Sequence, residues 1–200
     1  MRHDKIAAAI HRELCQKHGF EYAEKSYNHH IDKESRVLEN EEVKIVWDFT
    51  LHTEKKLEYN KPDIVILAKK EKTVYIVDVG CPFDTRIKER ERTKIEKYTD
   101  LKYELPKVWK GEGTRVFILP IIKGAVGTMT KNVQENPDNL KIDIRVWDLQ
   151  KIGLLGTSRI LREVLDSLWR FWTMSGVAGI RPNKSGNNNN NNNNKNSYNT

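Results

Sequence analysis

Cysteine is scarce in this chain, and its scarcity excludes two kinds of protein. Only Cys15 and Cys81 occur among 200 residues. Two thiols so far apart in the sequence cannot build a disulfide framework, and by themselves they cannot supply the ligands of a zinc knuckle. Cys81 follows an apolar run and is expected to be a reduced, partly buried thiol. We therefore expect an intracellular, non-secreted protein.

Long hydrophobic runs are missing as well. Residues 1–5 contain no apolar region of signal-peptide length. The longest apolar stretch, 116–122, is interrupted by Pro120 and is far too short to cross a bilayer. Gly111-Glu112-Gly113 has the pattern of an ordinary turn, and nothing resembles a phosphate-binding glycine loop. We therefore expect no membrane partner.

Positive charge is what the chain has in excess. Charged residues make up 32% of the sequence, the formal net charge is +7 and the isoelectric point is near 9.3. This balance favours a polyanionic partner, although a merely basic soluble protein has the same composition. The length predicts one domain, residues 1–172, followed by a tail, 173–200. Eight consecutive asparagines at 187–194 predict that this tail is disordered.

Hydrophobic periodicity predicts an α/β (α+β) fold. The expected elements are, in order, a helix over 4–18, strands over 43–51, 62–68 and 73–79, a helix over 85–105, a strand over 114–122, a short helix over 128–135, a strand over 142–147 and a helix over 149–172. The stretch 20–41 is polar and is expected to be irregular. Pro106 is expected to end or kink the second long helix. The order helix, three strands, helix, strand predicts a mixed sheet flanked by helices, with a further helix at the C-terminal end.

Two apolar strands each carry one aspartate, and the turn between them brings the aspartates face to face. A four-residue loop, 69–72, gives the easier hairpin, because Lys70-Glu71 is a poor two-residue turn. The pairs expected on one side of this hairpin are Leu67 with Val74, Val65 with Ile76, and Asp63 with Asp78. Directly opposed residues hold their Cβ atoms within about 5 Å of each other.

Two ionised carboxylates so close together repel each other, and burying them unpaired costs several kcal/mol or more. A divalent cation between Asp63 and Asp78 removes both problems, which predicts a metal site of a nuclease. The alternative is that Asp78 caps a turn or pairs with an arginine, and that Asp63 belongs to ordinary turn chemistry. Asp48, on the preceding strand, is a candidate third ligand, with Glu41 and Glu42 as alternatives.

The helix predicted over 85–105 supplies cations next to these acids. Its segment 86–97 is net positive, because it contains three glutamates and six basic residues, namely Arg86, Lys88, Arg90, Arg92, Lys94 and Lys97. A lysine that reaches the aspartates could position or deprotonate the attacking water, or stabilise the transition state. The alternative is a solvated, charged helix. Trp169 and Trp172 on the last helix are expected in the core, and His29 and His30 are treated as loop residues without a metal role.

Ordered segments of this chain resemble a known family. They are residues 2–5, 37–40, 45–48, 61–63, 77–80, 94–98, 121–128 and 154–161. Together with Lys61-Pro62-Asp63, a fourteen-residue gap and Asp78, they resemble the PD-(D/E)xK restriction-endonuclease superfamily. The branch that they resemble most is the restriction-like endonuclease at the C-terminus of non-LTR retrotransposon polyproteins, downstream of a reverse transcriptase. The resemblance covers roughly residues 1–168 and implies a restriction-endonuclease-like α-β-β-β-α-β core.

The resemblance also implies an activity. It implies a Mg²⁺- or Mn²⁺-dependent enzyme that nicks target DNA in the nucleus for target-primed reverse transcription. Asp63 and Asp78 match the metal-binding carboxylates of the family, with Asp48 as a further candidate. Gly80 stands where the superfamily has its lysine, and in this branch the following helix carries it, so Lys97 is the first choice and Lys94 the second. Arg86, Lys88, Arg90 and Arg92 are expected to follow the phosphate backbone.

Two parts of such a polyprotein are missing from this chain. The zinc-binding segment that would precede Arg2 is not present, and the reverse transcriptase, the expected partner, is not present either. We therefore expect a truncated or decayed copy. The alternative function is a catalytically inactive nucleic-acid-binding remnant of the polyprotein.

Overall fold

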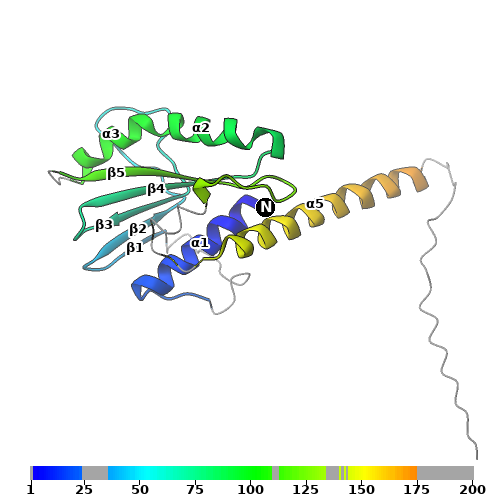
Figure 1. The fold of residues 1–200 in the computed structure, drawn as a ribbon, viewed down its shortest axis with the longest axis horizontal. Helices are drawn as coiled ribbons and strands as arrows, with labels where there is room; N and C mark the ends of the chain where they lie inside the picture. The colour runs from blue at the N-terminus through cyan, green and yellow to red at the C-terminus, as the bar shows by residue number, and fades with distance from the viewer. Residues whose placement is uncertain are drawn as a thin grey trace, which may run out of the picture. The chain divides into compact units, whose positions relative to one another are not determined.

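The computed structural model describes residues 2–23, 36–109, 113–133, 140, 142 and 144–174. Figure 1 shows the elements, which are, in chain order, α1 (Arg2–His18), β1 (Val37–Glu39), β2 (Val43–Trp47), β3 (Ile64–Ala68), β4 (Thr73–Gly80), the 3₁₀ helix η3 (Asp84–Arg86), α2 (Ile87–Lys97), α3 (Thr99–Val108), β5 (Arg115–Ile122) and α5 (Val146–Met174). The predicted α-β-β-β-α-β order is confirmed by α1, β2, β3, β4, the α2–α3 segment and β5.

The five strands form one mixed sheet in the order β1-β2-β3-β4-β5. The first four strands pair antiparallel with their neighbours, and β5 lies parallel to β4. A short loop suffices between antiparallel strands, whereas a parallel neighbour needs a long crossover. The crossover here contains η3, α2 and α3, which places the basic helix beside the strand that carries Asp78.

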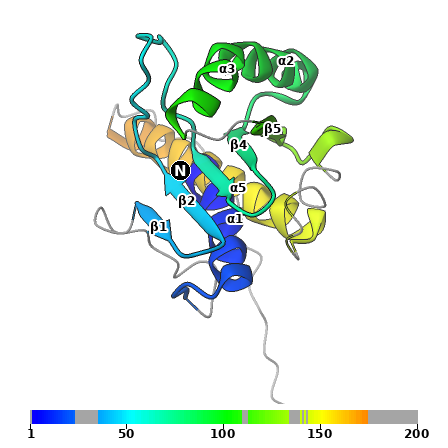
Figure 2. The same cartoon turned by 90° about the vertical axis from the view of Figure 1, so that its left-hand side faces the viewer.

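Helices cover the two faces of the sheet, as Figures 1 and 2 show from two directions. Ile64 and Ile66 of β3 belong to the core that α1 covers, together with Ile6 and Ile10 of that helix. The alternate residue Val65 belongs to the second core, which contains Tyr98, Leu101 and Leu105 at and after the α2–α3 junction. Strand residues buried on both faces explain why β3 and β4 are apolar almost throughout.

The start of α5 holds the start of α1. Arg2 donates from Nη1 to Thr157 Oγ1 at 3.0 Å, and Thr157 donates to the carbonyl of Ala125 in the glycine turn. Gly156 makes this approach possible, because a Cβ there would lie 2.6 Å from Arg2 Cγ. Gly153 likewise leaves room for the buried Lys123, whose Nζ would lie 2.3 Å from a Cβ at 153.

Several predicted boundaries were wrong, for local reasons. The strand expected over 43–51 ends at Trp47, because Asp48 takes a positive φ of 41° and turns the chain away. The short edge strand β1 lies in the stretch expected to be irregular. The helix expected over 85–105 breaks at Tyr98, whereas Pro106 lies inside the last turns of α3 and does not end it.

The C-terminal half contains one further correction. No strand forms among the described residues of 142–147, since α5 already begins at Val146. The glycine turn at 124–127 is confirmed by the bond from Gly127 N to the Gly124 carbonyl. The short helix expected over 128–135 lies partly outside the described residues, as do His29 and His30 entirely.

The chain divides into two compact units, residues 1–162 and 163–200. Of the second unit the structure describes 163–174, the C-terminal part of α5. Trp169 and Trp172 there are 47% and 56% exposed, so the prediction that they belong to the core was wrong. The predicted tail from 175 onward lies outside the described residues. Within the described part of the chain, no helix combines the length and apolar character that a membrane span requires.

Candidate active site

The predicted register of the two aspartate-bearing strands is confirmed. Val65 lies opposite Ile76, and Leu67 lies opposite Val74. The last pair of the ladder is Ile64 with Val77, and one further step along the same register sets Asp63 opposite Asp78. The loop between the strands has the four residues 69–72, and Lys72 adopts a positive φ of 47° to close it.

Asp78 is the buried member of the pair. Its residue is 2% exposed, at the end of β4 on the side of the sheet that α2 covers. Its Oδ1 accepts a hydrogen bond from the Tyr98 hydroxyl at 2.9 Å. Burial, followed by the nearby charge of Asp63, raises the pKa of Asp78, against the opposing effect of Lys94 and Tyr98. This effect agrees with the strand register, which sets the two carboxylates opposite each other.

Asp63 lies in the bend just before β3, where its carboxylate closes the hairpin. Its Oδ2 accepts the backbone N–H of Val79 at 2.6 Å, in place of a ladder partner. The same oxygen lies 2.9 Å from Nε2 of His3, in the first turn of α1. The other ring nitrogen of His3 lies 3.0 Å from Asp4 Oδ1. The Asp63 hydrogen bond is the main reason that the pKa of His3 rises to about 9, so the ring is a cation that donates to both carboxylates.

Lys94 comes from α2 and reaches Asp78 directly. Its ammonium group forms an ion pair with Asp78 Oδ2, and its side chain is only 10% exposed. A Cβ at position 80 would lie 3.6 Å from Lys94 Cε, an ordinary van der Waals distance, and 2.8 Å from Ile122 Cδ1. Gly80 is therefore needed for the close packing of β4 against Ile122, and Lys94 passes beside it in normal contact.

Lys97 reaches the site through Tyr98. Its Nζ donates to the Tyr98 hydroxyl at 2.9 Å and lies 5.5 Å from the centre of the Tyr59 ring. The single proton of that hydroxyl is given either to Asp78 or to the carbonyl of Lys61, which lies 3.1 Å away. Of the two predicted lysines, Lys94 thus contacts Asp78 directly, whereas Lys97 is linked to Asp78 through the Tyr98 hydroxyl.

Asp48 lies next to Asp63 but is engaged elsewhere. Its backbone N–H donates to the Asp63 carbonyl at 2.8 Å, and both residues line a small pocket of about 240 Å³ with His3. The Asp48 carboxylate is 2.8 Å from Lys61 Nζ and 3.8 Å from Arg36. Its role as a third metal ligand stays a prediction.

The alternative ligands Glu41 and Glu42 are far from the site. Both lie at the other end of β2, where Val43 pairs with Ala68, and Glu42 forms an ion pair with Lys70 of the hairpin loop. With about 3.3 Å per residue, the five residues of β2 separate them from the aspartates by some 15 Å. The hypothesis that Glu41 or Glu42 could serve as the third metal ligand in place of Asp48 was therefore wrong.

The donors at Asp63 and Asp78 fit a hard divalent cation. Asp78 Oδ2 is fully buried, and the Lys94 ammonium group is its ion-pair partner. Mg²⁺ is commonly held by one or two carboxylates, with water and substrate phosphate completing its shell. No group of three or more histidine, cysteine or acidic side chains is arranged to hold a metal within the described ranges.

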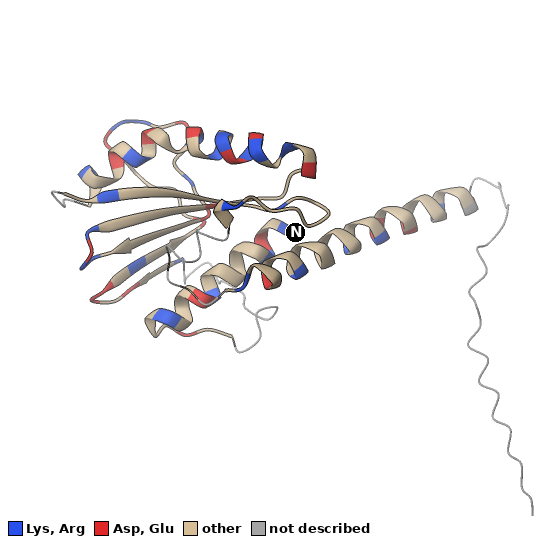
Figure 3. Ribbon diagram, viewed as in Figure 1, with Lys and Arg blue, Asp and Glu red and all other residues tan. Residues whose placement is uncertain are grey.

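The four basic residues expected to follow DNA lie on the exposed surface of η3 and α2. Figure 3 shows basic and acidic residues alternating along this helix. Arg86 is 3.5 Å from Glu89, and Arg92 is 3.5 Å from Glu96. Lys88 and Arg90 have no carboxylate within ion-pair distance among the described residues, so their charges are the more available ones.

Two residues of the site were not predicted from the sequence. His3 was noted only as part of a matching segment, and its contact with Asp63 joins positions 60 residues apart. Tyr98 was noted only as the neighbour of Lys97. A completely buried tyrosine next to a charged helix needs a partner for its hydroxyl, and that is the signal by which it could have been found.

No protein-family model matches the chain, and no curated protein matches it. Among solved structures it is similar to an N-terminal domain of a reptarenavirus L protein, at 14% identity and a TM-score of 0.33. The match covers 77% of this chain and 66% of that one, slightly less than two thirds of its length.

Proposed function

We propose that this chain is a divalent-cation-dependent endonuclease that nicks DNA by hydrolysing a phosphodiester. The observation that carries the proposal is the meeting of Asp63 and Asp78 at one end of the sheet, with a buried lysine against the second acid. Such a pair of carboxylates suits Mg²⁺ or Mn²⁺. The bound ion would polarise the scissile phosphate and lower the pKa of the attacking water.

The remaining groups of the site have roles that follow from their contacts. Tyr98 fixes Asp78 by donating to Oδ1, and His3 fixes Asp63 by donating to Oδ2. Lys94 supplies positive charge beside the place where negative charge develops on the phosphate. Lys97 holds Tyr98 and adds a second cation at the mouth of the site. The basic residues of η3 and α2 bind the phosphate backbone without reading its sequence.

A nicking assay on supercoiled plasmid tests this proposal. The wild-type protein should nick with Mg²⁺ or Mn²⁺ and not with EDTA, and Asp63→Asn and Asp78→Asn should each abolish nicking. Asp166→Asn is the matched control, because this aspartate is exposed on α5 and outside the site. Metal-dependent nicking that survives both site substitutions would exclude this pair as the active site.

One observation favours a second candidate, a nucleic-acid-binding remnant without activity. The Lys94 ammonium already compensates the charge of Asp78, so the folded site needs no metal to be stable. Under this alternative, DNA binding persists without nicking, and Mg²⁺ leaves the melting temperature unchanged. A functional carboxylate site gains stability when the ion binds only the folded state.

The proposed origin depends on the matching sequence segments alone. We propose that the domain derives from the C-terminus of a non-LTR retrotransposon polyprotein, with the PD-(D/E)xK active site of that family. Its DNA target would then lie in the nucleus, and its partner would be the reverse transcriptase of the parent element. Expression beside such a reverse transcriptase, followed by a pull-down and a target-primed synthesis assay, tests this part separately.

A further inference from the structure

The loop between β2 and β3 is well anchored and lies beside the candidate active site. Leu51 and Leu57 of this loop are each 8% exposed and pack into the same core as Tyr98. Leu51 N donates to the carbonyl of Asn60 at 2.9 Å, and the Asn60 side chain donates back to the carbonyl of Leu51 at 3.0 Å. These contacts hold the following residues in place opposite α2.

A pocket of about 600 Å³ lies between this loop and α2. Its lining residues come from the loop and from the helix, and they are Leu57, Glu58, Tyr59, Arg90, Thr93, Lys94, Glu96, Lys97 and Asp100. Ligand pockets of 300 to 1,000 Å³ are typical for molecules of the size of a nucleotide. Lys94, which forms the ion pair with Asp78, is part of this lining, so the pocket is next to the candidate active site although Asp78 itself does not line it.

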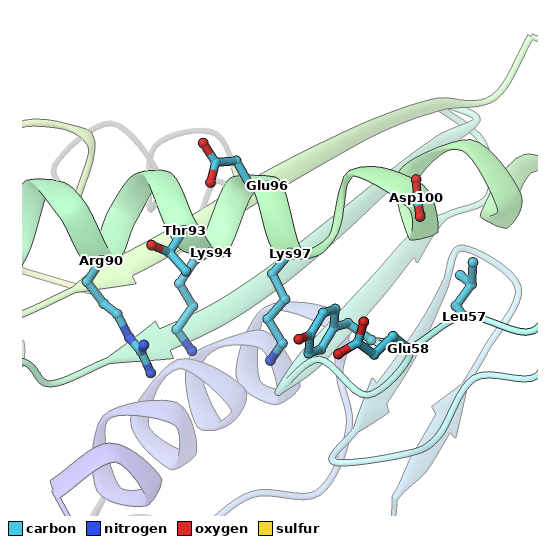
Figure 4. A pocket seen from close by; sticks show the side chains of 9 residues that line it. Leu57, Glu58, Arg90, Thr93, Lys94, Glu96, Lys97 and Asp100 are labelled. Atoms are coloured by element: carbon cyan, nitrogen blue, oxygen red, sulfur yellow. The ribbon is translucent and has the colours of Figure 1, made fainter.

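The cations of the pocket are gathered on one side of the helix. Figure 4 shows Arg90, Lys94 and Lys97 pointing from α2 in the same direction, whereas Glu96 points away from them. Lys94 is paired with Asp78, so Arg90 and Lys97 carry the available positive charge on this side, and the lining also contains three carboxylates. This arrangement suits phosphate groups, and phosphates on both sides of a nucleotide would reach Arg90 and Lys97.

Tyr59 supplies the apolar and aromatic surface of the pocket. Its side chain is 45% exposed, although it projects from a loop that is otherwise well anchored. Lys97 Nζ lies 5.5 Å from the centre of its ring, which restrains the ring next to the cations. An exposed aromatic ring beside phosphate-binding cations is the arrangement with which proteins stack unpaired bases.

We propose that this pocket holds one unpaired nucleotide of the cleaved strand next to the scissile phosphate, with its base stacked on Tyr59. The inference depends on the proposed nuclease function for the position of the scissile phosphate. Bases inside a duplex are already stacked, so the pocket favours single-stranded or locally opened nucleic acid over an intact duplex. The cut then falls beside the base that Tyr59 holds.

Binding of labelled oligonucleotides in EDTA tests the pocket without any cleavage. The proteins are the wild type, Tyr59→Ala and Tyr59→Phe, with Tyr103→Ala as a control for an exposed tyrosine of α3 outside the pocket. We expect Tyr59→Ala to lower the affinity for single-stranded DNA roughly 5- to 150-fold. Tyr59→Phe and Tyr103→Ala should keep it within about twofold, and duplex binding should hardly change. Equal losses for Tyr59→Ala and Tyr103→Ala, or none for either, would overturn the proposal.

Abasic substitutions then locate the nucleotide. A single abasic position in the single strand should reproduce the loss caused by Tyr59→Ala, and it should have no further effect in that variant. RNA of the same sequence, tested in parallel, distinguishes a DNA site from one that accepts either polymer. A position-specific effect in a protein that never nicks supports the pocket and refutes the nuclease function. Nicking with no effect at any position supports the nuclease and refutes the pocket.

Discussion

Lys94 of α2 forms an ion pair with Asp78 near the end of β4, and both side chains are almost completely buried. A Cβ on residue 80 would meet Ile122 Cδ1 at 2.8 Å and Lys94 Cε at 3.6 Å. The close approach at Gly80 is thus to Ile122, whereas Lys94 passes the strand at ordinary van der Waals distance and places its ammonium group against Asp78. This geometry makes Lys94 the direct partner of the buried acid, and it separates the expected effects of changing the two lysines.

Lys94→Met and Lys97→Met should differ in stability. Removing Lys94 leaves a buried carboxylate without its cation, and breaking a buried ion pair on one side costs about 3 kcal/mol or more. Lys97 is half-buried and pairs with a hydroxyl, so we expect a loss of less than about 1 kcal/mol for its replacement. Urea unfolding at neutral pH measures both values. Equal losses would mean that Lys94 does not carry the charge compensation of Asp78.

His3 is expected to support activity through Asp63. A histidine that orients a metal-binding carboxylate typically contributes 10- to 100-fold to affinity or activity. We expect His3→Ala to lower the nicking rate by roughly that factor, and His3→Gln to recover part of it, because an amide can still donate to Asp63. His52→Ala, at an exposed histidine of the β2–β3 loop, is the control and should be neutral. If His3→Ala nicks at the wild-type rate, the contact has no functional role.

Asp84 should make the glycine turn sensitive to acid. Its carboxylate accepts the N–H groups of Val126 at 2.8 Å and Thr128 at 3.0 Å. Burial alone would raise the pKa of Asp84, but hydrogen bonds from Thr128 and Val126 outweigh it and lower the pKa below its ordinary value. The stabilisation is thus present above the ordinary pKa, near pH 4, and is lost as the pH falls through the lowered value.

Asp84→Ala should therefore destabilise the protein mainly at neutral pH. We expect a loss of about 1 kcal/mol at pH 7, and a smaller difference from the wild type below about pH 4, once the carboxyl group is protonated in both states. Melting curves from pH 3 to pH 7 measure it, with Asp166→Ala as a control that should show no such trend. A difference that grows toward low pH would contradict the assignment.

The basic residues of η3 and α2 should contribute unequally to nucleic-acid binding. Arg86 and Arg92 are each engaged by a glutamate one turn away, whereas Lys88 and Arg90 are not. We expect the double change Lys88→Gln/Arg90→Gln to make the negative slope of log K against log salt shallower, where K is the association constant for duplex DNA. The slope should change by nearly one for each lost phosphate contact. The double change Arg86→Gln/Arg92→Gln should change the slope less. Binding to duplex DNA measured from 50 to 200 mM salt gives the slope for each variant. Equal slopes for the two double variants would contradict the expected larger contribution of Lys88 and Arg90.

The sequence predicted the hairpin well because register leaves little freedom in a strand that is buried on both faces. A slip of one residue would have turned Val65 and Ile76 to the wrong core and separated Asp63 from Asp78. The short strand β1 could not be predicted, since three residues at a sheet edge carry no periodicity. The break at Tyr98 escaped detection because the hydrophobic spacing continues across it, and the contact of the Tyr98 hydroxyl with Asp78 joins residues 20 positions apart.

The same distinction applies to the site. Asp63, Asp78 and Lys94 could be proposed from strand register and helical spacing, which are local properties. His3 and Tyr59 could not, because their positions depend on how α1 and the β2–β3 loop dock on the sheet. Asp48 was proposed as a ligand from its strand position, but the turn that its positive φ creates directs it toward Lys61 and Arg36.

Arg2 and Thr157 are joined across 155 positions of the chain. Within this chain, that hydrogen bond can form only after residue 157 has been synthesised. One contact that holds the turn of α1 next to His3 therefore becomes available late in translation, long after Asp63 and Asp78 have been made.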